Sequence, residues 1–306
     1  ILVAVLSLIL GMGLPTTANY IVVSSLMAPV IISVGAQVGL VVPLIAVHMF
    51  VFYFGILADD TPPVGLAAYA AAAISRGDPI KTGLQGFGYD IRTALLPFLF
   101  IFNTDLLLID VSFGHAIFVF FISLLAMLLF AAATQGYFIA KSRIWESVVL
   151  LFIAFMLFRP GFFLDMVEEP YVSASGGAAI ELMSEEPDGA DIRVLIEGPD
   201  FDTGQMRPTT VVIPAVAGDG ETALADQGLT VFEEGDRLLL EEPFPGTPLF
   251  DQLGTEYDYY ADNPVVISAV EVENERIAKE WFFIPALLLL AGVVMIQRPR
   301  ARQPAF

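Results

Sequence analysis

Cysteine is absent from the 306 residues, and histidine and tryptophan occur only twice each. Without cysteine the chain has no disulfide framework, no thiolate metal site and no cysteine nucleophile. The two histidines, His48 and His115, lie in apolar surroundings, and two isolated histidines make a poor metal site. The sequence also contains no Gly-x-Ser-x-Gly and no His-Glu-x-x-His motif. We therefore expect neither an enzyme nor a bound cofactor.

Basic side chains are scarce, with 14 Lys and Arg against 34 Asp and Glu. The imbalance is local, because residues 165–280 hold 27 acidic and 5 basic side chains, a net charge of −22, while the rest of the chain is nearly neutral. An acidic segment of this kind argues against nucleic-acid binding, which needs basic patches. It is typical of a solvated surface, and a docking surface for a cationic partner is the alternative.

Apolar residues dominate the remainder: 56% of the chain is hydrophobic and the mean hydropathy is +0.73. This composition predicts membrane spans. The chain starts at Ile1 inside an apolar run, without an initiator Met, a basic region or a cleavage site, so this run is not a signal peptide. We expect the chain to be a piece of a longer protein.

Two apolar stretches are interrupted by helix-breaking residues. "GMGLPTTANY" begins at Gly11, and "ADDTPPVGLA" begins at Ala58. The first joins two arms, each shorter than the roughly 20 residues that a transmembrane helix needs, so we predict a re-entrant hairpin over residues 1–35. One long kinked helix is the alternative. The second stretch predicts a broken helix over 39–75, because Pro62 and Pro63 end one helix and suit the start of another.

The remaining apolar runs predict spans at 93–109, 116–139 and 145–163, and a last helix with a basic tail at 281–306. Residues 76–92 are polar and predict an interfacial loop. Lys and Arg favour the cytoplasmic side, and the basic loops fall on one side if the spans are as drawn. The C-terminus is then cytoplasmic, and residues 164–280 are periplasmic or otherwise extracytoplasmic.

Residues 164–280 carry short alternating runs such as "IRVLIEG" and "VVISAVEVE", separated by Gly, Pro and Asp. That pattern favours a small β-rich domain. The predicted fold class is therefore an all-α polytopic membrane protein with an inserted β-rich extracytoplasmic domain.

Interrupted helices leave backbone N–H and C=O groups without partners, which in lipid survive only where they are packed in protein or line a polar cavity. Free carbonyls suit a small cation, and the N-terminus of a half-helix suits an anionic group. Asp59 and Asp60 are costly at membrane depth and are functional candidates, although each could instead face water or cap the next half-helix. Asn103, Thr104 and Asp105 could line the same cavity, but helix packing or a place near the outer interface is favoured.

The residues also carry a resemblance. "GMGLPTTANYIVVSSLMAPVI" and "FGILADDTPPVGLAAYAAAAI", with their Gly-x-Gly-Leu-Pro-Thr and Thr-Pro-Pro-Val-Gly signatures, resemble the second hairpin and broken helix of the large membrane subunit of tripartite ATP-independent periplasmic (TRAP) transporters. The sequences of these two stretches are most similar to those of the fused permeases that work with a TAXI-type binding protein. "EEPFPGTPLFDQLG" and "KEWFFIPALLLL" resemble a C-terminal extension that some of these permeases carry.

This resemblance implies an elevator-type carrier of the inner membrane that imports organic acids with sodium as the coupling ion. Its implied partners are a periplasmic substrate-binding protein of TAXI type, the remaining N-terminal part of the permease and membrane lipid. The implied ion-binding residues are Gly13, Pro15, Thr16, Thr17, Asp60, Thr61, Pro62 and Gly65. The residues assigned to the substrate are Thr17, Asn19 and Pro63.

Two other functions remain as alternatives. An intramembrane aspartyl enzyme is disfavoured because the side chains of adjacent Asp59 and Asp60 diverge in a helix or strand. A non-transporting scaffold or sensor, whose acidic outer domain binds a partner, is the second alternative.

Overall fold

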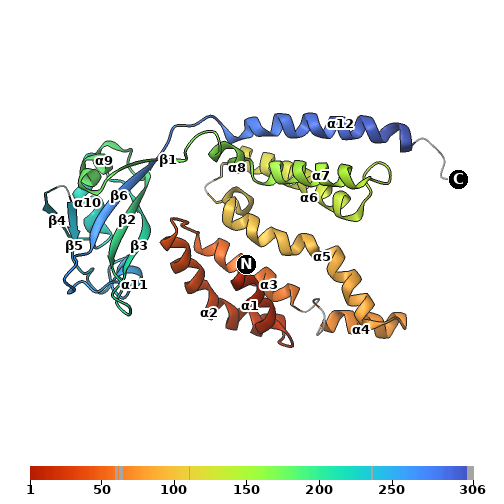
Figure 1. Ribbon diagram of the computed structural model, residues 1–306, viewed down its shortest axis with the longest axis horizontal. Helices are drawn as coiled ribbons and strands as arrows, with labels where there is room; N and C mark the ends of the chain where they lie inside the picture. The colour runs from red at the N-terminus through yellow and green to blue at the C-terminus, as the bar shows by residue number, and fades with distance from the viewer. Residues whose placement is uncertain (59–60, 62–64, 110, 236, 302–306) are drawn as a thin grey trace. The chain divides into compact units, whose positions relative to one another are not determined.

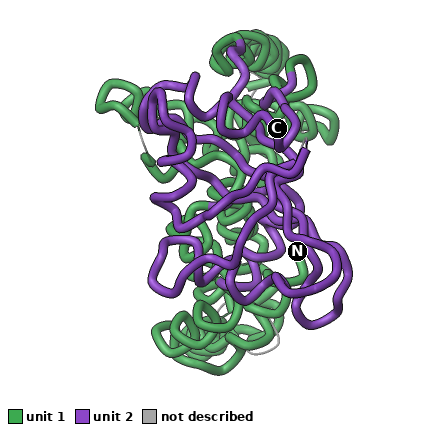
Figure 2. The backbone as a smooth tube through the Cα atoms, turned by 90° about the vertical axis from the view of Figure 1, so that its left-hand side faces the viewer, with its two compact units in different colours: residues 1–28, 43–168, 277–306 green, residues 29–42, 169–276 purple. Residues whose placement is uncertain are grey.

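The computed structural model describes residues 1–58, 61, 65–109, 111–235 and 237–301. The chain divides into two compact units (Figure 2). The helical unit holds residues 1–28, 43–168 and 277–306, and the sheet unit holds residues 29–42 and 169–276. The expectation of a mostly helical protein with a small β-rich part is confirmed.

The first interruption is a tight turn between two helices. Helix α1 covers Leu2–Gly11 and helix α2 covers Thr16–Gln37 (Figure 1). Gly13 lies between them with φ +82°, a left-handed conformation that glycine adopts without steric cost. Because α2 has 22 residues and is long enough to cross a membrane, the expectation of a short second arm is wrong. The re-entrant course of the hairpin stays a prediction.

Helices α3, Leu44–Leu57, and α4, Leu66–Ser75, flank the second interruption, and α5 follows at Pro79–Phe102. The interfacial loop that we predict over residues 76–92 is wrong from Pro79 onward. Proline suits the first helical position, and the Asp78 carboxylate accepts a hydrogen bond from the Lys81 amide at 2.8 Å. This N-cap starts the helix inside the polar stretch.

The second half of the helical unit contains the short 3₁₀ turn η1, helices α6 and α7, the short helix α8, the turn η3 and helix α12. Their bounds are Thr104–Leu107, Phe113–Gln135, Ile144–Phe158, Pro160–Asp165, Lys279–Phe282 and Phe283–Ala301. Leu129, Leu150 and Ile153 are fully buried between these helices.

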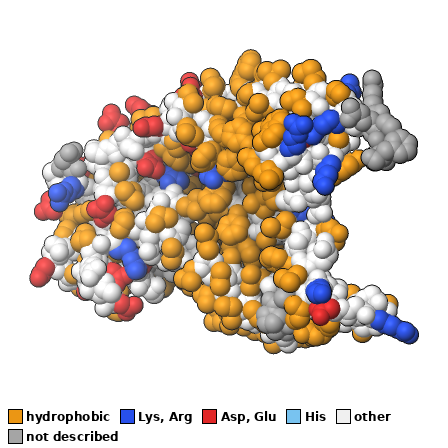
Figure 3. Space-filling model, turned by 45° about the vertical axis from the view of Figure 1, so that its right-hand side comes forward, with side chains coloured by type: hydrophobic (Ala, Val, Ile, Leu, Met, Phe, Trp, Pro, Cys, Tyr) orange, Lys and Arg blue, Asp and Glu red, His pale blue; other side chains and the backbone are white. Residues whose placement is uncertain are grey.

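Within the described residues, three helices are long and apolar enough to cross a membrane: α2, α6 and the helix Lys279–Ala301. Most of the large side chains exposed on α6 are apolar, and Phe120, Phe121 and Leu128 each expose about 60% of their surface. Hydrophobic side chains cover a wide area of the helices in Figure 3. Such a surface suits contact with lipid.

In the part of the sheet unit that the structure describes there are six antiparallel strands. They are β1 Tyr171–Ser175, β2 Asp191–Pro199, β3 Met206–Pro214, β4 Val231–Glu234, β5 Arg237–Leu240 and β6 Val266–Glu273. The order is β3-β2-β6-β5-β4, and β1 also pairs with β6. Ile192, Val194 and Ile196 alternate into the core, as expected for a strand with one buried face.

Four short helical pieces complete the sheet unit. They are the 3₁₀ turn η2 Gly176–Ala178 and helices α9 Ala179–Glu185, α10 Gly220–Asp226 and α11 Phe250–Leu253. Met183 of α9 and Leu224 of α10 belong to the same core as the strands.

Candidate functional site

The two interrupted stretches meet in the helical unit. A Cβ atom built on Gly11, at the end of α1, would lie only 2.7 Å from the Cβ of Ala58, which follows α3. The backbones approach this closely because neither position carries a large side chain. The structure therefore brings the first interruption against the second, forty-seven positions further along the chain.

Asn19 lies at this meeting point and is fully buried. Its Nδ2 atom donates a hydrogen bond to the Gly55 carbonyl at 2.9 Å. A Cβ on Gly11 would come within 2.2 Å of the same Nδ2 atom, so only glycine fits there. Among the described residues the Asn19 Oδ1 atom has no hydrogen-bond partner. A buried amide oxygen without a partner is costly and is available to a ligand.

Thr61 marks the C-terminal side of α3. Its hydroxyl donates to the Leu57 carbonyl at 2.6 Å, and its own carbonyl accepts the Gly65 amide at 3.1 Å. The hydroxyl oxygen keeps lone pairs free for another contact. Gly65 is buried with φ near 0°, immediately before α4.

The other predicted site residues fall into two groups. Gly13, Pro15 and Thr17 are exposed, and Thr16 is the half-buried first residue of α2. Asp59, Asp60, Pro62 and Pro63 lie outside the described residues. The structure thus brings Asn19 to the second interruption, near Gly55 and Ala58. Gly13, in contrast, borders open space, because a Cβ added there would meet no atom within 4 Å.

Sequence reasoning missed three participants. Ser7 of α1 is fully buried, and within the described part of the chain its hydroxyl has no partner. Tyr20 and His48 join α2 to α3 through a 2.9 Å contact between the phenol oxygen and Nδ1. The available signal was spacing, because Ser7 precedes Gly11 by four positions and so shares its helix face.

The chemistry of the meeting point is that of neutral oxygen ligands. Asn19 Oδ1 at the meeting point, and the Thr61 hydroxyl on the C-terminal side of α3, are hard oxygen donors, which suit a small hard cation better than a transition metal. In the described ranges no group of three or more His, Cys, Asp or Glu side chains could hold a metal ion.

A second polar group has a packing role. The Asn103 side chain donates to the Phe158 carbonyl at 2.7 Å, which joins the end of α5 to the end of α7. Asp105 forms an ion pair with Lys279, and the His115 Nε2 atom lies 3.7 Å from the same carboxylate. These contacts agree with the packing role favoured for this segment.

Residues 1–115 match the family described as the DctM component of tripartite ATP-independent periplasmic transporters. The resemblance to the large TRAP subunit is thereby confirmed for this part, while the TAXI branch stays a prediction. Residues 116–303, more than half of the chain, match the domain of unknown function DUF3394. No curated protein and no solved structure matches the chain. The chain therefore belongs to the DUF3394 family, and it joins that domain to a transporter segment of DctM type.

Proposed function

We propose that the chain is part of the permease of a sodium-coupled, binding-protein-dependent secondary transporter that imports organic acids. One observation carries the proposal: the buried Asn19 oxygen, which has no hydrogen-bond partner among the residues that the structure describes, lies where the two interrupted segments meet. Paired interruptions are the best sequence pointer to a midplane transport site. The DctM match and the apolar helices support a carrier of the inner membrane.

Sodium binds in this proposal between the first interruption and the end of α3. Asn19 Oδ1 and the Thr61 hydroxyl lie on the two interrupted segments. Since a sodium ion prefers oxygen ligands, closing the two segments around it would satisfy oxygens that otherwise stay unpaired. Gly13, Pro15, Thr16, Thr17, Asp60, Pro62 and Gly65 complete the proposed ion site.

The substrate is an organic acid in this proposal. Helix α2 begins at Thr16, and the positive end of a helix dipole attracts carboxylates. Thr17 is exposed in the first turn of this helix, where its hydroxyl could donate to a carboxylate. Together with Asn19 and Pro63 it forms the proposed substrate contact.

The word "tripartite" in the family description implies two further components. We assign these roles to a TAXI-type periplasmic binding protein and to the remaining N-terminal part of the permease. In this proposal the acidic domain is periplasmic, the C-terminus is cytoplasmic and the transport helices move as an elevator.

The test is sodium-dependent uptake by the full-length permease in proteoliposomes, with its binding protein and the ligand identified on that protein. Thr61→Val removes the hydroxyl and keeps the shape, and we expect at least a tenfold rise in the sodium concentration for half-maximal uptake, which corresponds to about 1.4 kcal/mol. Thr134→Val is the matched control, because the Thr134 hydroxyl bonds the Phe130 carbonyl in the same way but is exposed on α6. Gly13→Leu should also weaken sodium dependence.

Unchanged sodium dependence in Thr61→Val and Gly13→Leu would exclude the proposed ion site. The alternative function, a non-transporting scaffold or sensor, is tested by deleting residues 165–280. If the full-length protein never transports and the deletion abolishes only complex assembly, the scaffold function is correct.

A further inference from the structure

The last part of α2 and the loop after it belong to the sheet unit and not to the helical unit. Residues Pro29–Val42, which contain the end of α2 and the loop before α3, form one compact unit with residues Glu169–Arg276. The DctM match covers the first of these segments and the DUF3394 match covers the second. The contacts between them therefore join the two family regions directly.

Arg193 of β2 makes the first of these contacts. Its Nε atom donates to Glu271 of β6 at 2.9 Å, and its guanidinium lies 4.2 Å from the centre of the Tyr171 ring of β1. These two interactions fix the orientation of the side chain on the sheet. The remaining Nη2 atom donates to the Gly39 carbonyl at 2.5 Å. The side chain is only 14% exposed, so this contact is largely shielded from water.

Gly39 is suited to this contact by its backbone. Its φ is +72°, and a Cβ at this position would lie 3.3 Å from the Arg193 Nη2 atom. The loop is also closed on itself, because the Leu40 amide donates to the Gly35 carbonyl at 2.8 Å. The end of α2 therefore presents a defined carbonyl to the sheet.

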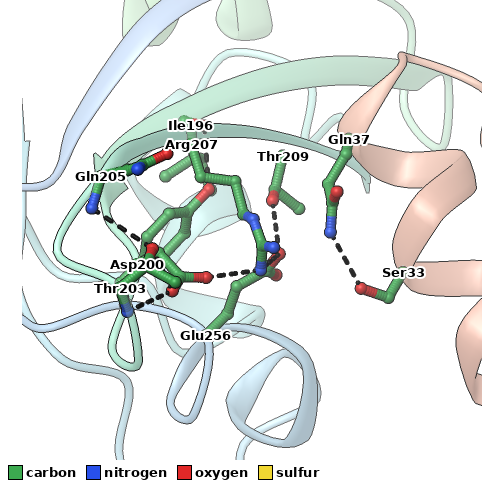
Figure 4. A network of polar contacts seen from close by, with 10 residues as sticks. Ser33, Gln37, Ile196, Asp200, Thr203, Gln205, Arg207, Thr209 and Glu256 are labelled. Carbon is green, nitrogen blue, oxygen red and sulfur yellow. Dashed lines mark hydrogen bonds and ion pairs between the residues drawn. The ribbon is translucent and has the colours of Figure 1, made fainter.

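Glu256 makes the second contact (Figure 4). Its Oε1 atom accepts the Thr209 hydroxyl at 2.9 Å and lies 3.9 Å from Arg207 Nη1. Arg207 is held in turn by Asp200 at 2.6 Å. Gln37 of α2, whose Nε2 atom donates to Ser33 at 3.2 Å, lies near Glu256 and favours the charged form of its carboxylate. The polar network of the sheet thus reaches the last turn of α2.

We propose that the sheet domain restrains the hairpin formed by α1 and α2 by holding the end of α2 through Arg193 and Glu256; we call this contact the clasp. This assigns a role to the domain of unknown function: it restrains the helix that also carries Asn19, and so sets the rate at which the carrier changes conformation. Pro29, inside α2 at the unit boundary, removes one helical hydrogen bond and provides a bending point. The effect on transport rests on the proposed function, whereas the clasp itself does not.

Cross-linking tests the contact in the full-length permease in membranes, and the absence of cysteine in this chain favours paired cysteine variants. Gln37→Cys combined with Glu256→Cys is treated with a short bifunctional thiol reagent, and linked peptides are quantified by mass spectrometry. The control pair is Gln37→Cys with Glu233→Cys, which lies exposed on β4 at the other end of the strand order from β3. We expect at least a fivefold higher yield for the first pair, and equal yields would overturn the clasp.

Hydrogen exchange provides an independent measurement on the same protein. Arg193→Gln removes the bond to Gly39, and we expect amide exchange in residues 35–42 to accelerate at least tenfold. Arg237→Gln changes an exposed arginine of β5 in the same domain and serves as the control. Unchanged exchange in Arg193→Gln, or equal acceleration in both variants, contradicts the proposal.

Uptake by the linked protein tests the restraint. We expect the Gln37–Glu256 link to slow sodium-dependent uptake at least fivefold and Arg193→Gln to alter its rate, while the unlinked pair transports. Equal uptake before and after linking overturns the restraint on transport. If no preparation shows sodium-dependent uptake, the proposed function fails, and cross-linking and exchange still decide the clasp.

Discussion

At the scale of single residues, the close approach around Asn19 depends on glycine and alanine positions that have no chemistry of their own. Gly11 permits the approach, Gly55 provides a carbonyl and Ala58 leaves space. Sequence patterns indicate the polar residues of the interruptions, and among those that the structure describes, Asn19 alone is both fully buried and left with an oxygen that has no hydrogen-bond partner. Asn19 is buried and its neighbour Thr17 is exposed because only Asn19 lies on the side of α2 that packs against α3.

Gly11→Ala tests this packing. The added methyl group would lie 2.2 Å from Asn19 Nδ2 and 2.7 Å from Ala58 Cβ, so something must move. We expect the free energy of unfolding to fall by about 1–3 kcal/mol, the usual cost of overpacking, together with impaired sodium-dependent uptake. Thermal unfolding in detergent and uptake are the measurements. Gly86→Ala on α5, where an added Cβ meets no atom within 4 Å, should be neutral or stabilising; equal behaviour of the two variants contradicts the proposed packing.

The raised pKa of Glu256 predicts that the stability of the sheet unit depends on pH. Burial raises the pKa of Glu256 above its ordinary value, and the Thr209 hydrogen bond and the nearby Arg207 charge offset this only in part. The folded state therefore binds the Glu256 proton more tightly than the unfolded state, so this side chain favours folding at low pH and loses that contribution as pH rises through the folded pKa. Asp200 and Asp219 have lowered pKa values because Thr203 and Thr222 donate hydrogen bonds to them. Their ionised carboxylates therefore stabilise the folded state at neutral pH, and this contribution is lost only as pH falls through and below the ordinary Asp pKa.

Glu256→Gln isolates this effect. The amide oxygen still accepts the Thr209 hydroxyl but cannot ionise. We expect the melting temperature of the variant, relative to the original protein, to rise progressively from pH 4.5 to pH 8. Melting curves across this range, with Glu233→Gln on β4 as an exposed control, are the measurement. A difference that stays constant with pH would show that Glu256 does not titrate in the folded protein.

At the scale of elements, helix ends were harder to predict than helices. The apolar runs at 116–139 and 145–163 overlap helices α6 and α7, whereas the polar stretch over residues 76–92 predicts a loop and the structure has helix α5 there from Pro79 onward. Asp78 and Pro79 form a good helix start in the sequence, and this signal outweighs the low hydropathy that follows. Likewise α2 includes Thr16, Thr17 and Asn19, and the Asn19 amide donates to the Pro15 carbonyl at 2.9 Å, so the proline stands at the start of the helix, where it is tolerated.

The contact between α7 and α12 is specified by polar groups. Glu146 is fully buried and accepts Arg300 Nη2 at 2.5 Å and Gln297 Nε2 at 2.9 Å. Gln297 also accepts the Ile139 and Ala140 amides at 3.1 and 3.2 Å. A buried carboxylate that keeps all its donors fixes the register of the two helices.

Arg300→Met should break this contact. Removing one partner of a buried pair costs about 3–5 kcal/mol, and we expect the lower end because the Arg300 side chain is 26% exposed. Thermal unfolding in detergent measures the loss. Arg298→Met removes an exposed arginine from the same helix turn and should change stability little. Equal stability of the two variants would mean that the Glu146 contact does not hold α12.

At the scale of the whole molecule, the chain joins a transporter segment to a helical and sheet module. The family boundary at residue 115 falls near the start of α6, so the second family includes α6, α7, α12 and the whole six-stranded sheet. The sheet has its own core, which includes Ile192, Ile196 and Ile267. It should therefore unfold as a cooperative unit.

Ile196→Ala should destabilise that unit alone. Removing a fully buried isoleucine costs about 2–5 kcal/mol through lost burial and a cavity. We expect faster proteolysis within residues 169–276 of the full chain in detergent, with the helical segments still protected. Leu195→Ala, on the half-exposed face of the same strand, is the control. Simultaneous loss of protection in the helices would contradict two separate units.

The sequence by itself determined the composition-driven features: apolar helices, an acidic β-rich insertion and two interrupted segments that carry a TRAP signature. These follow from local periodicity, helix-breaking residues and charge, which need no distant contact. Tertiary structure alone decided that Gly11 meets Ala58, that the Asn19 oxygen is buried without a partner among the described residues, and that Arg193 reaches Gly39. Such contacts join residues far apart in the chain, and their geometry depends on packing that no local pattern specifies.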